Sequence, residues 1–184
     1  MIEIGKKTAL LVADETKSGF TLQSDDGDEV FLPGSMAPKD LTIGQSLVVF
    51  VYTDTKGSRM ATPEVPLAEV DSFAYLRVKD VTDFGAFFDW GISKDLLVPG
   101  NQQKVKVQLG EYHLVRICLE PETGRLFGTT KIGAYTETSD VDLKEKEVVD
   151  ILPFKKTSLG IQVLIEEKYM GMLYHNEVFS KITL

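Results

Sequence analysis

The sequence predicts an all-β protein made of tandem small barrels, each of about five strands, with the third barrel incomplete. The chain repeats itself at a fixed spacing, which is typical of an array of similar modules. Short runs alternate apolar and polar residues, as half-buried strands do, and no segment shows a sustained helical stripe. Polar turns that contain glycine separate these runs and suit β-hairpins.

The repeat has a period of 66 residues, seen in three matching pairs: Gly19 and Gly85, Pro33 and Pro99, and Gly44 and Gly110. Between these anchors, residues 29–35 resemble residues 95–101 without a gap. A third copy begins near Glu147, where Gly160 matches Gly85 at a separation of 75 residues. The additional residues fall in the polar stretch 136–146, which we expect to be a linker.

These spacings predict three domains at residues 1–63, 66–135 and 147–184. A single antiparallel sheet of this size has nothing else to pack on, so closing into a barrel buries one face and removes the edges. The five-stranded OB fold is the expected closure. The third copy reaches Leu184 before its last two strands, so we expect the N-terminal part of a barrel that a longer protein would complete.

The strands are expected in the following order. In the first copy the clearest alternating run is 47–52, between the turns 25–28 and 56–58. In the middle copy a strand at 74–78 precedes two short strands around the turn in 83–99, and a strand at 113–119 leads into the turn 122–124. In the third copy, 159–163 and 171–174 correspond to the two short strands.

Composition narrows the class of protein. The chain is 43% hydrophobic and 26% charged, without an apolar run that could span a bilayer and without the apolar core of a signal peptide, so the expected location is the cytoplasm. One cysteine and two histidines do not make an ordinary zinc site. The net charge of −8 argues against a strongly electrostatic nucleic-acid binder. The middle copy, with 8 Lys and Arg against 9 Asp and Glu, is closest to neutral.

Residues 70–132 contain Asp83-Phe84-Gly85-Ala86-Phe87 at a tight turn, followed by the strand 96–99 and by Gly124-Arg125. In these features they resemble the S1 domain, an RNA-binding OB module. The triple arrangement, including 151–156 at the start of the third copy, is similar to the conserved virulence factor B family of bacterial cytoplasmic proteins. That resemblance implies tandem S1 modules followed by a winged helix, and RNA binding tied to control of gene expression.

The resemblance also implies a binding surface on the middle copy. Phe84 and Phe87 match the two ring positions on which bases stack, and Arg125 matches the hairpin arginine. Two members of the family pattern are absent, because Pro99 replaces its histidine and Pro121 stands four residues before the arginine.

Other candidates come from alternation and from the third copy. Tyr75, Arg77 and Lys79 alternate along one strand, so they share a face and could extend a groove. Tyr174 occupies the histidine position of the third copy and offers a ring for one base. For Phe84 and Phe87 an interpretation as rim packing stays open beside base stacking. Phe88 and Trp90 are expected to pack in the core and at the rim.

Two functions remain open. The first is a non-catalytic regulator that binds single-stranded RNA weakly, with little sequence preference, chiefly through the middle barrel. The second is a scaffold whose barrels dock on a partner protein or on ribonucleoprotein machinery. The sequence contains no phosphate-binding loop with lysine and no Ser/His/Asp order, so we expect no catalysis, and we expect no metal or other cofactor.

Overall fold

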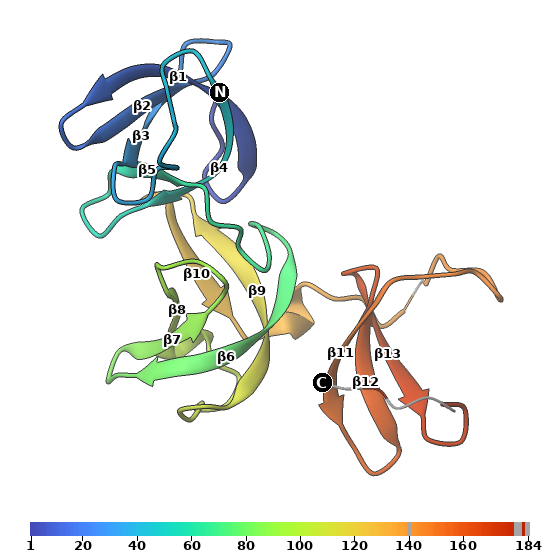
Figure 1. Ribbon diagram of the computed structural model, residues 1–184. Coiled ribbons are helices and arrows are strands. Elements are labelled where there is room, and N and C mark those ends of the chain that lie inside the picture. Colours follow the sequence, from blue (N-terminus) through green and yellow to red (C-terminus); the bar gives the residue numbers. More distant parts are fainter. Residues whose placement is uncertain (140, 179–181, 183–184) are drawn as a thin grey trace.

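The computed structural model describes residues 1–139, 141–178 and 182. Regular structure in these residues is β, apart from the short 3-10 helices η1 (Gly100–Gln102) and η2 (Ile132–Ala134). Neither of these described helices is long or apolar enough to cross a membrane. The strands form three sheets that follow one another along the chain, with the third sheet to the side of the middle one (Figure 1). The prediction of an all-β fold is confirmed.

The first sheet is a closed five-stranded barrel in the order β1-β2-β3-β5-β4. Its strands are β1 (Lys7–Thr16), β2 (Gly19–Gln23), β3 (Glu29–Pro33), β4 (Ser46–Thr53) and β5 (Arg59–Thr62). The barrel closes where Phe31 of β3 pairs in parallel with Met60 of β5. Inward side chains, such as Leu22 and Leu32, are fully buried.

The middle sheet has the same strand order but is a half-barrel. Its strands are β6 (Phe73–Val81), β7 (Gly85–Asp89), β8 (Leu96–Pro99), β9 (Tyr112–Glu120) and β10 (Arg125–Thr129), ordered β10-β9-β6-β7-β8. The edge strands approach closely, since a Cβ added at Gly128 would lie 2.7 Å from Val98 Cγ2. No ladder joins β8 to β10 in the described residues, so the five predicted strands form without hydrogen-bonded closure.

The third sheet is open and has three strands, β11 (Ile151–Lys156), β12 (Gly160–Ile165) and β13 (Tyr169–Tyr174). The described residues of the polar stretch before it are irregular except where Glu137 pairs with Tyr169. There the Glu137 N–H donates to the Lys168 carbonyl at 2.9 Å, and the Met170 N–H donates to the Glu137 carbonyl at 3.2 Å. One edge of the sheet is therefore tied to the segment that leads into it.

The sheets share two local devices at the repeat spacing. The first strand of each sheet has a bulge at the same position, at Ala13, Lys79 and Phe154. A threonine precedes each matching glycine by three residues and donates its hydroxyl to that glycine's carbonyl: Thr16 to Gly19, Thr82 to Gly85, and Thr157 to Gly160. The bulges and the threonine–glycine hydrogen bonds thus recur at the separations of 66 and 75 residues that the sequence repeat shows.

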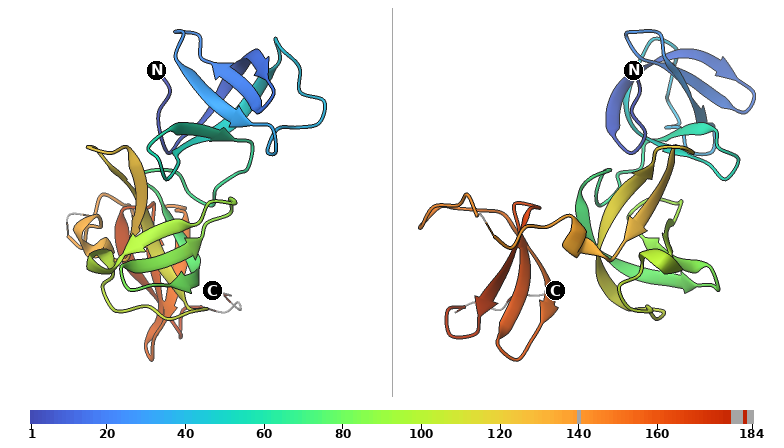
Figure 2. Two further views of the ribbon diagram at one scale, coloured as in Figure 1. Left: turned by 90° about the vertical axis from the view of Figure 1, so that its left-hand side faces the viewer. Right: turned by 180° about the vertical axis from the view of Figure 1, so that it is seen from behind.

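The first barrel and the middle sheet share a hydrophobic core. In β4, Val49 and Val51 point into their own barrel, whereas Phe50 and Tyr52 point outward into the core of the middle sheet. The Phe50 ring meets the Trp90 ring edge to face, with centroids 5.4 Å apart. Figure 2 shows the two units stacked end to end from two further sides. The first barrel and the middle sheet therefore bury apolar surface against each other.

The third sheet packs against the outer face of β6 and β9. Leu164 is buried together with Phe73 and Leu114 of those strands and with Ile132 of η2. Phe154 and Met170 are partly buried at the margin of this cluster. The contact fixes the third sheet beside the middle one through apolar side chains.

Candidate nucleic-acid interface

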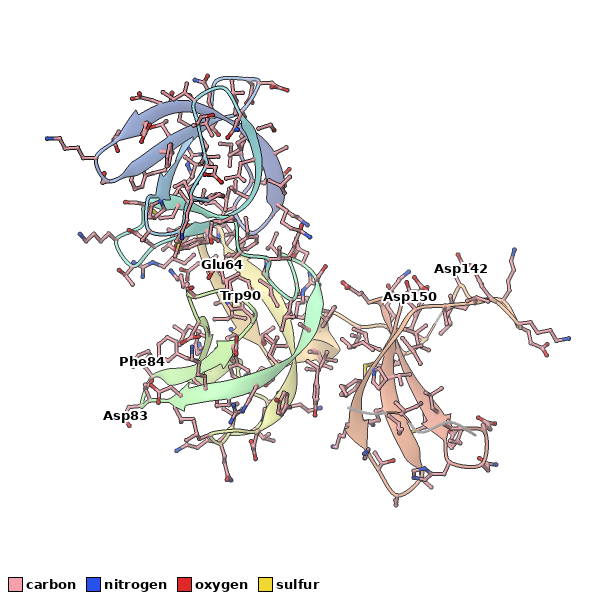
Figure 3. The ribbon with its side chains drawn as sticks, viewed as in Figure 1. Glu64, Asp83, Phe84, Trp90, Asp142 and Asp150 are labelled. Carbon is pink, nitrogen blue, oxygen red and sulfur yellow. The ribbon has the colours of Figure 1, made fainter. Side chains whose placement is uncertain are left out.

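Phe84 and Phe87 form an aromatic pair on the middle sheet. Phe84 lies just before β7 and is 63% exposed, whereas Phe87 is partly buried on the outer face of β7. The ring centroids are 6.0 Å apart at an interplanar angle of 86°. Figure 3 shows Phe84 beside Asp83 at the end of the sheet that lies away from the third sheet. Phe88 and Trp90 are buried in the core, as predicted.

A pocket of about 320 Å³ lies between this face and the first barrel. Phe87 and Arg125, both expected from the sequence, line it together with Leu97. The remaining lining comes mainly from the β4–β5 turn and from residues 90–97: Tyr52, Thr53, Asp54, Thr55, Trp90, Lys94, Asp95, Leu96 and Leu126. The Arg125 guanidinium donates to the Thr55 carbonyl at 3.2 Å, so the first barrel helps to hold it.

Lys94 also lines this pocket, and no sequence motif had identified it as a site residue. Its ammonium donates to the Thr53 carbonyl and lies 5.4 Å from the centre of the Tyr52 ring. Burial lowers the pKa of Lys94, and the nearby Asp54 opposes that effect. Both contacts come from the first barrel, so only the packing of the two units places this lysine. Since Asp54 and Asp95 also line the pocket, its two cations are balanced by two carboxylates.

Tyr75 and Arg77 share the outer face of β6, as the alternation predicted, and Lys79, the bulged residue of that strand, is also exposed. Lys79 forms an ion pair with Asp95 at 2.8 Å, and this hydrogen bond raises the pKa of Lys79. The register of β6 with β9 places Arg77 opposite Tyr112. Tyr75 lies at the other end of this face, toward the third sheet. Neither Arg77 nor Lys79 lines the pocket that contains Phe87.

Tyr174 ends β13 and is 47% exposed. It pairs with Gly160 across the third sheet, as Pro99 pairs with Gly85 in the middle one. It lines neither of the two pockets described for this chain. Of the predicted binding residues, Phe84, Phe87 and Arg125 therefore form one group. The others, Tyr75, Arg77, Lys79 and Tyr174, lie elsewhere.

Residues 4–64 match a family model described as an S1 domain. This range is the first barrel, whereas the aromatic motif had placed the resemblance on the middle copy. The first barrel lacks aromatic rings at the stacking positions, which hold Ser18 and Thr21. The match therefore reflects the shared barrel fold and not the presence of aromatic side chains at the stacking positions.

The chain is 28% identical to conserved virulence factor B of Staphylococcus aureus strain USA300 and 27% identical to that of strain MRSA252, each over 95% of its length. It spans about 61% of the length of these relatives. A crystal structure of a multidomain protein with nucleic acid binding domains from Streptococcus pneumoniae superimposes with a TM-score of 0.58 at 20% identity. That match covers 97% of this chain and 65% of the other, and it shows a shared fold. By sequence, the chain is thus similar to conserved virulence factor B proteins along nearly its whole length, and its first barrel matches the S1 domain model.

Proposed function

We propose that this chain is a non-catalytic, cytoplasmic RNA-binding protein that holds single-stranded RNA on the middle sheet and regulates gene expression. The observation that carries the proposal is the Phe84 ring, which is 63% exposed beside Phe87. Leaving a phenylalanine in water forfeits about 1.5–3 kcal/mol of burial, so an exposed ring next to a second ring suits a stacking partner. The S1 domain and the resemblance to conserved virulence factor B support this choice.

In this proposal a base stacks on Phe84, with Phe87 supporting that ring from its edge. The RNA backbone then passes Arg125, whose guanidinium already borders the same pocket as Phe87. Base faces stack on rings regardless of identity, at about 1–3 kcal/mol per base, so we expect little sequence preference. The charge balance of the pocket makes binding through this face alone weak.

The test is fluorescence anisotropy with a labelled single-stranded RNA of about sixteen nucleotides, the upper end of the range that one OB barrel covers. Phe84→Ala combined with Phe87→Ala should weaken binding at least about tenfold, since it removes one or two stacking contacts. Ile43→Ala with Val48→Ala is the matched control, because both side chains are exposed apolar groups on the first barrel. Circular dichroism verifies that each variant is folded.

Equal affinity in the parent and in the aromatic double variant would remove the proposed platform. An absence of RNA binding by the parent at low salt would overturn the proposed function and favour the protein-interaction scaffold.

A further inference from the structure

The larger pocket, of about 670 Å³, lies where the third sheet meets the middle sheet. Its lining comes from β6, β9, β11, β12, β13 and the segments around η1 and η2. The side chains that line it include Tyr75, Tyr112, Lys104, Lys155, Lys156 and Gln162. The volume falls within the usual range for small-ligand sites, about 300–1,000 Å³.

The charge of this pocket is opposite to that of the chain. The chain has a net charge of −8, yet three lysines and no carboxylate stand among the described residues that line the pocket. Two acidic residues adjoin lining residues in the sequence: Glu137, whose carboxylate forms an ion pair with Lys168, and Glu111, which precedes Tyr112. The Glu111 carboxylate accepts hydrogen bonds from the Gln108 N–H at 2.8 Å and from the His113 ring at 2.9 Å, and both lower its pKa. The pocket is therefore a local cationic site on an acidic protein, which favours an anionic ligand.

A bulge explains how adjacent residues come to line one pocket. In a regular strand, successive side chains point to opposite faces. The bulge at Phe154 breaks this alternation, and Phe154, Lys155 and Lys156 all line the pocket. Lys155 pairs across the sheet with Gln162, the residue 75 positions after Phe87. The face of the third copy that corresponds to the Phe87 face of the middle copy therefore forms one wall.

The opposite wall carries aromatic rings. Tyr75 and Tyr112 stack with centroids 5.5 Å apart and an interplanar angle of 28°. Tyr112 is 53% exposed, so part of its ring is available to a ligand. Arg77 lies opposite Tyr112 on the same face and adds a cation at the margin. A planar ring beside several cations is the combination that single-stranded nucleic acid requires, for its bases and its phosphates.

We propose that this pocket is a second contact site for single-stranded RNA, with a base on the Tyr112 ring and phosphates on Lys104, Lys155 and Lys156. The inference rests on the proposed function and deepens it, since it assigns the phosphate contacts to a place that the aromatic motif does not include. A strand held here and on the Phe84 surface engages two sites on one chain, which raises the overall affinity.

The test compares the parent with the triple variant Lys104→Ala, Lys155→Ala, Lys156→Ala. The matched control removes three exposed lysines outside both pockets, Lys17, Lys39 and Lys144. Anisotropy with labelled oligouridylate is measured over a salt series. The pocket variant should bind at least about tenfold more weakly, and its slope of log affinity against log salt should fall by about 2, because each phosphate contact on a single strand contributes about 0.7.

Photocrosslinking with oligouridylate that contains 5-iodouridine locates the contact, because mass spectrometry identifies the attached residue. Crosslinks at Tyr112 or Tyr75 in the parent, lost in the pocket variant and kept in the control, would support the site. If the parent binds RNA but the pocket and control variants behave alike, this inference is wrong and the Phe84 surface stands. If the parent binds no RNA, both proposals fail. Binding of a labelled poly-glutamate peptide in place of RNA would reassign the pocket to acidic protein segments.

Discussion

Asp28 anchors the start of the chain to the first barrel. Its carboxylate accepts two hydrogen bonds from Arg59, at 2.8 and 3.0 Å, and one from the Ile2 N–H at 2.9 Å. The Arg59 guanidinium, followed by the Ile2 N–H, lowers the pKa of Asp28 well below its ordinary value of 3.8. Because the folded-state pKa is the lower one, this carboxylate stabilises the fold above pH 3.8 and loses that contribution as the pH falls further.

Arg59→Ala should therefore lower the melting temperature at pH 7, and its difference from the parent should shrink as the pH falls from about 4 toward 2. Thermal unfolding followed by circular dichroism over this range measures the effect. Arg77→Ala, at an exposed arginine of the middle sheet, should show a smaller and flatter difference. A deficit that stays constant with pH would show that Arg59 acts through packing alone.

Among the site residues, the sequence predicted those whose placement depends on local pattern. Tyr75 and Arg77 share a face because a strand alternates, and Phe84 and Phe87 lie together because a tight turn joins them to one strand. Local sequence patterns could not predict which charged or polar groups the lysines of this region contact. The ion pair of Lys79 joins β6 to the loop before β8, and the carbonyl that holds Lys94 belongs to another sheet.

At the scale of elements, one glycine in each second strand allows close approach of the next strand. A Cβ added at Gly85 would lie 2.6 Å from the Val98 carbonyl oxygen, and one at Gly160 would lie 2.1 Å from the Leu173 carbonyl oxygen. These obstacles are backbone atoms, so a side chain can be placed there only if the strands separate. Gly85 and Gly160 thus explain why a glycine marks the repeat.

Gly85→Ala should lower the free energy of unfolding by about 1–3 kcal/mol, as overpacking does. Gly133→Ala is the control, because a Cβ there meets no atom within 4 Å. Urea denaturation of both variants measures the difference. Equal stability of the two variants would mean that β7 and β8 separate at little cost.

The repeat predicted the three sheets and most strand positions, because glycine spacing and alternation are local signals. It did not predict that the middle sheet stays an unclosed half-barrel, since closure depends on the pairing of β8 with β10, which are distant in sequence. The bulges were also not predicted. The bulged residues Ala13, Lys79 and Phe154 have nothing in common chemically, so no residue type marks the position.

At the scale of the whole molecule, the first barrel and the middle sheet should unfold together. Phe50 belongs to the first barrel but is fully buried in the core of the middle sheet. Phe50→Ala should lower the free energy of unfolding by about 3–5 kcal/mol and shift the transition of both units. The emission of Trp90, the single tryptophan, reports this boundary during urea denaturation.

Hydrogen exchange of the β2 and β9 amides in the same variant tests whether the loss reaches both sheets. Ile161→Ala is the matched control, because Ile161 is buried in the third sheet and should leave the Trp90 transition in place. Two separate transitions in the parent, one for each of the first two sheets, would contradict a common core.

The outward position of Phe50 and Tyr52 also has a consequence during translation. The first barrel is complete at β5, but these two rings find their partners only when Trp90 and the strands up to β10 have been made. At ribosomal speeds of about 5–20 residues per second, that interval lasts roughly 3–13 s. For this time the nascent chain presents a pair of aromatic rings to solvent, and a chaperone that shields such rings would protect it from self-association until the second unit folds.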